Sequence, residues 1–562
     1  MKQTMKYLSM AALVVMGAIM AGCVKEEPTT EEENIVTLTV SVGFSEDEST
    51  KALDVDYINK TVVKYFSENE RIVVLYKSGS DTKRAVSGYL PTGFHSKSAT
   101  FSVPLYSPND NSPIRIIYPA DMAKSVSSST TIDNDDATIN YAALSTQDGT
   151  LNNLASNYDV CTFDGALSGN ALPTTASLTN RLAILSYTLY DGIGTAENKS
   201  DDVKITESVT KMTINDGTNN YTVSGRDADG HIYVAIRPTD STNIELIATD
   251  GTEYYGKSLT GKTYAAGQFY NITNRMEEVK YFTINPSGKK VLFAPGNLQA
   301  TWKGGKWSWA FAPNQWDYIG NAAGNTSING NGTVDADNVT VDLFGWVGGS
   351  NNTWTGDLGT TGNAAMHGIS NSTTTESQAT YGNNISEPLK SDWGNTIGYG
   401  WRTLTGDDDS DGEWVYILNT RASGSTVNGT TDARYTLATI NTDGTGVNGM
   451  ILFPDGITIA SGEVSSWGSI NDSSTWDAAT KCTSAQWTAL AAKGCVFLPA
   501  AGYRQGSMVK SVATNGYYWS SSYIYGDKER SYGVNFCNTS LYPWYMGFRS
   551  DGYSVRLVRE LE

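Results

Sequence analysis

The sequence predicts a mainly β protein, in which two β-sandwiches in tandem are followed by a mixed α/β domain. Short runs of alternating apolar and polar residues recur in the first half of the chain, and Asp-Gly turns separate several of them. Alternation with period two is typical of half-buried strands, and Asp-Gly between two such runs indicates a hairpin. All 14 tryptophans lie beyond residue 300, so the 562-residue chain divides into two parts of different composition.

Residues 1–22 are predicted to be a lipoprotein export signal. Two lysines, Lys2 and Lys6, precede an apolar run from Ala11 to Met20, which is shorter than the about 20 residues of a membrane-spanning helix. Met20-Ala21-Gly22-Cys23 resembles a bacterial lipobox. The resemblance implies acylation of Cys23 and a lipid anchor in the outer membrane, where several acyl chains hold a protein firmly. An ordinary signal peptide followed by an incidental cysteine is the alternative.

Residues 23–34 are predicted to be an acidic tether. The stretch has Pro, Thr and Glu but little apolar surface to bury, which favours disorder. Lys25 followed by acidic residues resembles the surface-export signal of lipoproteins in some Gram-negative anaerobes, which implies display at the cell surface. A plain solvated linker is the alternative.

The composition argues against several classes of function. The net charge is −19, and without a cluster of Lys and Arg we expect no nucleic-acid partner. Three scattered histidines lack metal-ligand spacing, and we find no phosphate loop or nucleophile elbow, so we expect neither an enzyme nor a required cofactor. Five cysteines are few for a disulfide scaffold. A bridge between Cys482 and Cys495 is not expected, and the pairing of Cys537 is left open.

The first half is predicted to hold one sandwich over residues 35–165 and a second over 166–280. The break is placed at a Ser/Thr/Gly-rich stretch near residues 167–179. Asn215-Asp216-Gly217 and Asp250-Gly251 are the predicted hairpin turns. Earlier in the chain, strands are predicted at 35–42, 72–76, 114–118 and 181–190.

Three motifs in this region resemble fimbrillin-like proteins, which are lipoprotein pilins and adhesins of Gram-negative anaerobes with two β-sandwich domains. The motifs are Thr50-Lys51-Ala52, the stretch from Glu68 to Val74, and the stretch from Gly267 to Ile272. The resemblance implies that a protease cuts after Lys51 and removes the first strand. A strand from a neighbouring pilin subunit would then fill the groove, which is β-augmentation. The alternative is that Lys51 is an ordinary surface lysine.

The chain departs from a shaft pilin at its C-terminal end. A shaft subunit donates its own last strand to the next subunit, whereas residues 281–562 follow the sandwiches here. A bulky domain at that end obstructs donation. The chain is therefore expected to accept a strand but not to pass one on, which suits a fimbrial tip or accessory subunit, or an adhesin that never polymerises.

Residues 281–562 resemble a paralogous surface domain with a C-type-lectin-like fold, which is also related to the formylglycine-generating-enzyme core. The stretches that carry the resemblance are 282–299, 401–416, 496–504, 516–522, 547–549 and 554–558. The resemblance implies a mixed α/β unit with long loops. Its helices are expected at Glu413–Asn419 and Ser484–Ala492, with Ser484 as the N-cap and Gly494 closing the second helix.

Aromatic side chains near the turn-rich end of this domain are the candidate ligand contacts, because aromatic rings stack on sugar rings. Arg504 and Arg549 could hydrogen-bond the same ligand, a glycan or a surface protein. The alternatives are core packing for the aromatic residues and structural ion pairs for the arginines. The aromatic candidates are Tyr517, Trp519, Tyr542 and Trp544.

Asp407, Asp409 and Asp411 form the candidate metal site. Their alternate spacing before Gly412 resembles the start of a calcium loop. A full calcium loop has Glu at its twelfth position, where this chain has Leu418. The alternative is a solvated acidic turn that caps the following helix.

Together these features predict a cell-surface lipoprotein adhesin of the fimbrial tip or accessory type. A free-standing lipoprotein that captures polysaccharide is the second hypothesis. A glycan-degrading enzyme is the third, since a carboxylate pair could lie among so many Asp and Glu residues.

Overall fold

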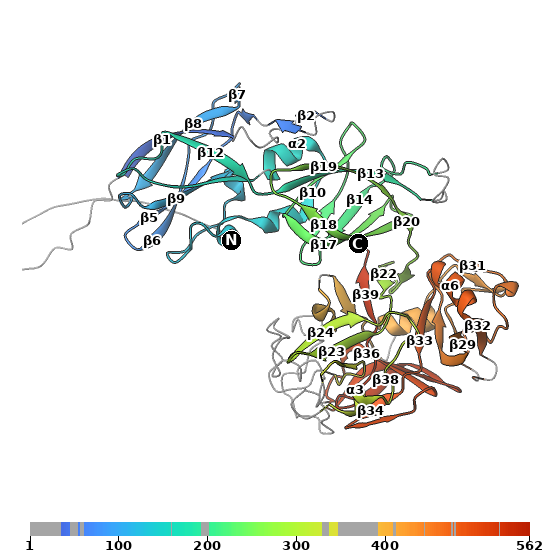
Figure 1. Ribbon diagram of the computed structural model, residues 1–562. Coiled ribbons are helices and arrows are strands. Elements are labelled where there is room, and N and C mark those ends of the chain that lie inside the picture. The colour runs from blue at the N-terminus through green and yellow to red at the C-terminus, as the bar shows by residue number, and fades with distance from the viewer. Residues whose placement is uncertain are drawn as a thin grey trace, which may run out of the picture.

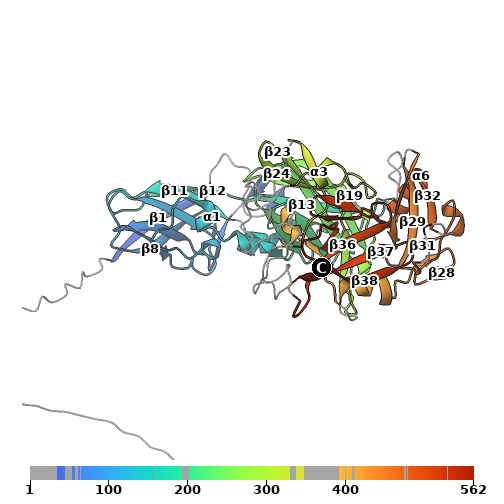
Figure 2. The ribbon, with the colours of Figure 1, turned by 90° about the horizontal axis from the view of Figure 1, so that it is seen from below.

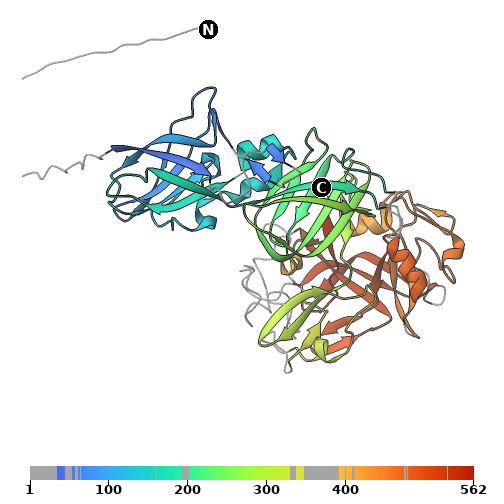
Figure 3. The ribbon, with the colours of Figure 1, turned by 45° about the horizontal axis from the view of Figure 1, so that its top comes forward.

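The computed structural model forms three packed parts, which we call the first sandwich, the second sandwich and the C-terminal module (Figure 1). The two sandwiches follow one another in a row, and the module lies against the second one, as Figures 2 and 3 also show. The predicted mainly β class, with sandwiches in the first half, is confirmed. No helix in the described part is long and apolar enough to cross a membrane. The described residues are 35–44, 54–56, 61–63, 65–158, 160–192, 202–328, 337–346, 392–398, 400–407, 412–442, 444–473, 476, 479–527 and 529–561.

The first sandwich is a single curled sheet in the strand order β6-β5-β9-β11-β12-β1-β8. The two layers join at β12, which pairs antiparallel with β11 and parallel with β1. Small pairs of strands, β2 with β3 and β4 with β7, lie beside it. The bounds are β1 (Ile35–Phe44), β2 (Asp54–Asp56), β3 (Thr61–Val63), β4 (Phe66–Ser67), β5 (Val73–Ser78), β6 (Asp81–Val86), β7 (His95–Ser96), β8 (Ser98–Tyr106), β9 (Pro113–Tyr118), β11 (Cys161–Ala166) and β12 (Thr175–Asn180).

Alternation along the strands builds the core of the first sandwich. In β8 the apolar Phe101, Val103 and Leu105 are buried, while Thr100 and Ser102, which alternate with them, are exposed. This is the period of a pleated strand with one face in the core. The inward side chains of β5, β9 and β12 meet those of β8 in one apolar cluster.

The second sandwich packs the sheet β10-β15-β14-β17-β18-β20 against the sheet β16-β13-β19. Short helices connect it to the first sandwich, and their apolar side chains enter the same core. The connecting helices are η1 (Ala120–Met122), α1 (Asp135–Thr138), η2 (Tyr141–Ser145), α2 (Leu151–Asn153) and η3 (Leu154–Tyr158). The strands are β10 (Thr146–Gln147), β13 (Ala183–Tyr190), β14 (Lys211–Asn215), β15 (Asn220–Val223), β16 (Ile232–Ile236), β17 (Thr239–Thr249), β18 (Tyr254–Tyr264), β19 (Phe269–Arg275) and β20 (Glu277–Glu278).

Both predicted Asp-Gly hairpins form. The Oδ1 atom of Asp216 accepts the backbone N–H groups of Thr218 and Asn219, and Gly217 adopts φ +84°. Asp250 accepts two N–H groups in the same way between β17 and β18. An aspartate that hydrogen-bonds the backbone just after it stabilises a tight turn, which is why the turns lie where the sequence places them.

The break between the sandwiches falls later than the expected position at residue 165. Strand β12 pairs with β11 and β1 of the first sandwich, and the next strand, β13, belongs to the second. The Ser/Thr/Gly-rich stretch is thus a turn and a strand of the first sandwich. In β12 alternate residues are buried, a pattern that its many hydroxyl side chains obscure in the sequence.

The C-terminal module combines several small sheets with short helices. Its sheets are β21-β22-β39-β26, β24-β23-β25, β28-β27-β31, β32-β29-β30-β33, β34-β35 and β36-β37-β38. The strands are β21 (Phe282–Thr283), β22 (Lys290–Phe293), β23 (Leu298–Lys303), β24 (Lys306–Phe311), β25 (Val339–Val341), β26 (Trp401–Thr403), β27 (Thr426–Val427), β28 (Thr430–Thr431), β29 (Tyr435–Thr442), β30 (Thr445–Leu452), β31 (Thr458–Ile459), β32 (Thr480–Thr483), β33 (Val496–Pro499), β34 (Tyr503–Gln505), β35 (Met508–Lys510), β36 (Asn515–Tyr523), β37 (Arg530–Cys537), β38 (Leu541–Phe548) and β39 (Leu557–Glu560).

The helices of the module follow the expected positions with two differences. The first is α5 (Glu413–Val415), which continues as a π-helical turn, η6 (Tyr416–Thr420). The second is α6 (Ser484–Ala492), whose N-cap is Thr483 and not Ser484, because Thr483 and Gln486 form a capping box. Short helices α3 (Ala323–Thr326), η5 (Trp393–Thr396) and η7 (Ser461–Glu463) complete the module.

Cys482, Cys495 and Cys537 are free thiols. Cys482 and Cys495 are buried in the apolar cluster beneath α6, and Cys537 is half-buried without a disulfide partner. Burial raises the pKa of Cys482 to about 12, so its reactive thiolate form is disfavoured. Cys23, the predicted lipid attachment site, lies outside the described residues.

Candidate functional site

Strand β1 is an interior strand of the first sandwich. It pairs antiparallel with β8 from Ile35↔Tyr106 to Gly43↔Ser98, and parallel with β12 from Ser41↔Thr175 to Phe44↔Leu178. Removal of β1 would therefore leave a groove with unpaired backbone groups on both flanking strands. Such a groove can accept an extended strand from another chain. Lys51, the predicted cleavage site, lies outside the described residues.

The last strand of the chain, β39, lies between β22 and β26 in the module. It pairs antiparallel with both neighbours, and its residues Leu557 and Val558 are fully buried. Glu560 at its end accepts a 2.7 Å hydrogen bond from Nε of Arg402. A strand held in this way is part of the module's own core and is not free to enter another subunit.

One face of β38 carries a row of exposed apolar side chains, which we call the β38 stripe. Its members are Tyr542, Trp544, Met546 and Phe548, with exposed fractions of 46%, 39%, 39% and 43%. In the described part of the chain β38 lies at the edge of its sheet, with β37 on one side. Large contiguous apolar patches on a protein surface commonly mark interaction sites, so the β38 stripe is the candidate site of the module.

The opposite face of β38 fixes the orientation of the stripe. Tyr545 packs edge-on against Tyr517, with ring centroids 5.5 Å apart. A Cβ atom on Gly547 would lie 2.4 Å from the ring of Tyr553, so only glycine lets the strand approach that ring. With one face pressed against buried tyrosines, the alternate side chains must point to solvent.

A positively charged side chain, Arg530, lies at one end of the stripe. The guanidinium of Arg530 on β37 lies 5.1 Å from the ring centroid of Phe548, directly opposite it in the sheet. The stripe thus offers flat apolar rings together with one hydrogen-bond donor group. Met546 and Phe548 were not among the candidates from the sequence, although their spacing of two residues continues that of Tyr542 and Trp544.

The other aromatic candidates lie in or near the core. Trp519 is fully buried, its Nε1 donates to the carbonyl of Phe344 at 2.6 Å, and it stacks on Tyr553. Tyr517 is half-buried between Tyr503 and Tyr545. Trp519 therefore does not present a ring to solvent, and its role is the core-packing alternative.

The two candidate arginines are buried as well. Arg504 is fully buried and donates to the carbonyls of Leu343 and Gly506. Burial lowers its pKa to about 10, which still leaves it protonated at neutral pH. Arg549, 6% exposed, lies 4.8 Å from the ring centroid of Trp346 and donates to two backbone carbonyls. Both hold neighbouring loops in place through hydrogen bonds to backbone carbonyls.

The candidate calcium loop is described in part. Asp407 is half-buried, while Asp409 and Asp411 lie outside the described residues, so the calcium prediction stays open. At the far end of the loop Glu413 forms a two-point ion pair with Arg402, at 2.6 and 2.7 Å. Among the described side chains, no group of three or more His, Cys, Asp or Glu is arranged to hold a metal ion.

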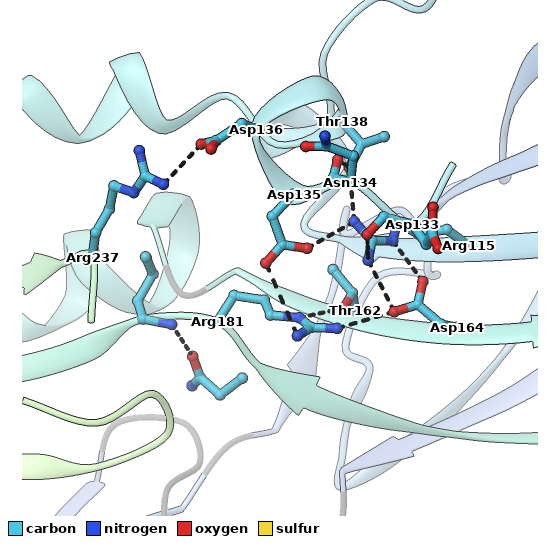
Figure 4. A network of polar contacts seen from close by, with 12 residues as sticks. Arg115, Asp133, Asn134, Asp135, Asp136, Thr138, Thr162, Asp164, Arg181 and Arg237 are labelled. Atoms are coloured by element: carbon cyan, nitrogen blue, oxygen red, sulfur yellow. Dashed lines mark hydrogen bonds and ion pairs between the residues drawn. The ribbon is translucent and has the colours of Figure 1, made fainter. Parts of the chain in front are cut away.

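A polar network joins the two sandwiches (Figure 4). Arg115 of β9, only 1% exposed, binds Asp164 of β11 and Asp135 of α1. Arg181, just after β12, reaches Asp164 at 3.0 Å, and Arg237 of the second sandwich binds Asp136 of α1 at 2.8 Å. Helix α1 is thus tied to both sandwiches. The charged residues of this network are spread along the sequence from Arg115 to Arg237. No local pattern therefore predicts that they meet.

Comparisons with known proteins give only distant similarities. No protein-family model matches the chain, and no curated protein matches it. A fimbrial protein from Bacteroides ovatus aligns at 13% identity and a TM-score of 0.23, covering 94% of this chain and 99% of that one. A fimbrial assembly protein from Parabacteroides distasonis aligns at 12% identity and a TM-score of 0.25, covering 46% of this chain and 95% of its own.

The fimbrial anchor protein of Porphyromonas gingivalis aligns at 10% identity and a TM-score of 0.25, covering 44% of this chain and 96% of that chain. Likenesses of this size do not define a family for the chain. The functional assignment therefore depends on the chain's own strands and surfaces.

Proposed function

We propose that this chain is a cell-surface adhesin that first reaches the outer membrane with lipid on Cys23 and then acts, after cleavage, as a tip or accessory subunit of a fimbria. The placement of its first and last strands carries the proposal. Strand β1 is interior and lies at the N-terminal end, so its removal opens a groove between β8 and β12. Strand β39 is interior to the module, so it cannot be donated.

A subunit whose first strand can be replaced and whose last strand is buried can accept a strand from a neighbour but cannot donate one. Such a subunit ends the filament. Cleavage after Lys51 would remove β1 together with the lipid anchor, and a neighbouring pilin's strand would replace β1. The truncated chain would then be held by that subunit and not by the membrane. This order of events places the module at the free end of a filament.

The module supplies the binding surface in this proposal. The β38 stripe presents Tyr542 and Trp544 along one strand face, and Arg530 lies beside Phe548 at the other end of the stripe. Aromatic rings with an adjacent guanidinium suit the apolar faces and hydroxyl groups of a glycan, or an aromatic-rich protein surface. The ligand is therefore proposed to be a glycan or a surface protein of a host or bacterial cell.

Immunogold electron microscopy of intact cells, with antibody against residues 281–562, tests the proposal. Gold at filament ends is the expected result. Gold spread over the cell body without filaments would contradict the fimbrial role and favour a free-standing lipoprotein that captures polysaccharide. Signal only after permeabilisation would contradict surface exposure. Turnover of a glycan by the purified chain would instead support the enzyme hypothesis.

A further inference from the structure

A cavity of about 380 Å³ lies between the second sandwich and the C-terminal module. Strands β14, β15 and β17 form one wall, and β26, β39 and η5 form the other. Figure 1 shows the C-terminal end of β39 just below β17 and β18, where the two parts meet. Pockets for small ligands hold about 300–1,000 Å³, so this cavity suits a ligand at the small end of that range.

The sandwich wall of the cavity is a patch of small polar side chains. On neighbouring strands Thr213 pairs with Thr222, and Asn215 pairs with Asn220 and with Glu245. Paired residues share a face of the sheet, so these side chains point together into the cavity. In the described part of the chain no hydrogen bond engages the side chains of Thr213, Asn220 or Thr222. Their donor and acceptor groups are available to a ligand.

The wall formed by the C-terminal module contributes the ring of Trp401 and two arginines that form ion pairs with carboxylates. Trp401 lines the cavity, and the guanidinium of Arg559 lies 5.3 Å from its ring centroid. Arg559 reaches Glu245 at 3.7 Å across the two parts of the molecule. Arg402 binds both Glu413 and Glu560, so each arginine at the cavity faces a carboxylate.

We propose that this cavity binds a neutral carbohydrate of one or two sugar rings. Amide and hydroxyl side chains both donate and accept, as sugar hydroxyls do. Trp401, which packs against Arg559 and Phe311, adds apolar surface at the cavity wall for the carbon atoms of a pyranose. A charged ligand is disfavoured because it would have to compete with the ion pairs of both arginines. The ligand is either a free sugar or the terminal residue of a longer glycan.

The proposal is independent of the β38 stripe, since none of the stripe's residues lines the cavity. A sugar bound here would contact β15 and β26 at once. It would therefore bridge the second sandwich and the module.

Isothermal titration calorimetry of the full chain tests the proposal with a panel of neutral monosaccharides and disaccharides and with oligosaccharides that end in the same sugars. The test variant is Asn220→Ala/Thr222→Ala. The matched control is Asn271→Ala/Thr273→Ala, which removes the same two residue types from the exposed face of β19 in the same sandwich. Circular dichroism confirms that both variants are folded.

We expect one or more of these neutral sugars to bind the full chain, and the test variant to bind at least tenfold more weakly than the control. Binding of free sugars identifies small sugars as the ligand, and binding of oligosaccharides alone identifies a glycan terminus. Absence of binding by the whole panel overturns the proposal, as does equal binding by the test variant and the control. A Tyr542→Ala/Trp544→Ala variant separates the two surfaces: if this variant loses the sugars and the test variant keeps them, binding belongs to the β38 stripe and the cavity proposal is overturned.

Discussion

Arg115 and Asp164 stand opposite each other on β9 and β11, and two hydrogen bonds join them, Nε to Oδ1 at 2.6 Å and Nη2 to Oδ2 at 2.9 Å. Burial alone would lower the pKa of Arg115, but its ion pairs with Asp164 and Asp135 raise it instead. The paired carboxylates thus hold a buried cation in its charged form. This contact fixes the register of two strands and, through α1, the junction between the sandwiches.

Asp164→Ala is expected to destabilise the first sandwich by about 3 kcal/mol, because it leaves a buried guanidinium without its main partner. The readout is the urea midpoint followed by far-UV circular dichroism. Tryptophan fluorescence reports only the module, since all 14 tryptophans lie beyond residue 300, and its midpoint should not change. Asp121→Ala removes a carboxylate whose side chain is 90% exposed and should cost at most about 1 kcal/mol. Equal effects of the two substitutions would contradict the prediction.

Deletion of residues 1–51 is expected to destabilise the first sandwich and to be reversed by a peptide of the β1 sequence, Ile35–Phe44. The peptide would refill the groove between β8 and β12, and stabilisation by a bound strand grows with its concentration. Thermal unfolding by circular dichroism measures the effect. A control peptide with proline at positions 38 and 40 lacks two backbone donors and should not restore stability. Rescue by the control peptide would argue against strand insertion.

Tyr542→Ala/Trp544→Ala is expected to weaken adhesion of the full chain to target cells by about tenfold, or about 1.4 kcal/mol. Large aromatic side chains at the centre of a contact surface commonly contribute this much. Flow cytometry with labelled protein gives the measurement. Tyr89→Ala removes a ring that is 63% exposed on the first sandwich and serves as the matched control. Unchanged adhesion by the double variant would remove the β38 stripe from the proposed function.

The stability of the module is expected to fall as the pH rises from about 4 to about 6. Burial raises the pKa of Asp342 to about 6, and burial likewise raises that of Asp551 to about 6, from an ordinary value of 3.8. The folded state therefore binds these protons more tightly than the unfolded chain, so each ionisation costs stability within that window. Glu463 and Glu560 have lowered pKa values, and their contribution is lost only below their ordinary value of 4.5.

Urea midpoints from tryptophan fluorescence at pH 5 and pH 7.5 check this prediction. The midpoint should be higher at pH 5. Asp342→Asn cannot ionise, and its side-chain oxygen can still accept a hydrogen bond, so the difference between the two midpoints should shrink in this variant. An undiminished difference would assign the pH dependence to other groups.

Local patterns were sufficient to predict the hairpins and the helix at Ser484–Ala492. The Asp-Gly turns are stabilised by hydrogen bonds between residues two positions apart, so the local sequence is sufficient to predict them. The same holds for α6, whose capping box and closing glycine are adjacent to it. The break between the sandwiches was misplaced, because β12 is assigned to its sheet by long-range partners in β1 and β11.

The candidate ligand residues show the same limit. Trp519 and Trp544 both sit in aromatic-rich strands with similar neighbours in sequence. Trp519 lies on β36 and is fully buried, whereas Trp544 lies on the face of β38 that points to solvent. Which face of a strand is covered depends on how the strands assemble, and alternation with period two is identical in both strands. The cavity beside Trp401 was also not predicted, because its walls come from two parts of the chain.

The interior position of β39 also sets the order in which the protein matures. Residues 291–293 of β22 must wait for partners that are made more than 260 positions later. During N-to-C synthesis the sandwiches can therefore fold while the module's sheet is still open between β22 and β26. The sheet of the module closes only after β39 has been made, so a chain interrupted before residue 557 would hold two folded sandwiches beside an incomplete module.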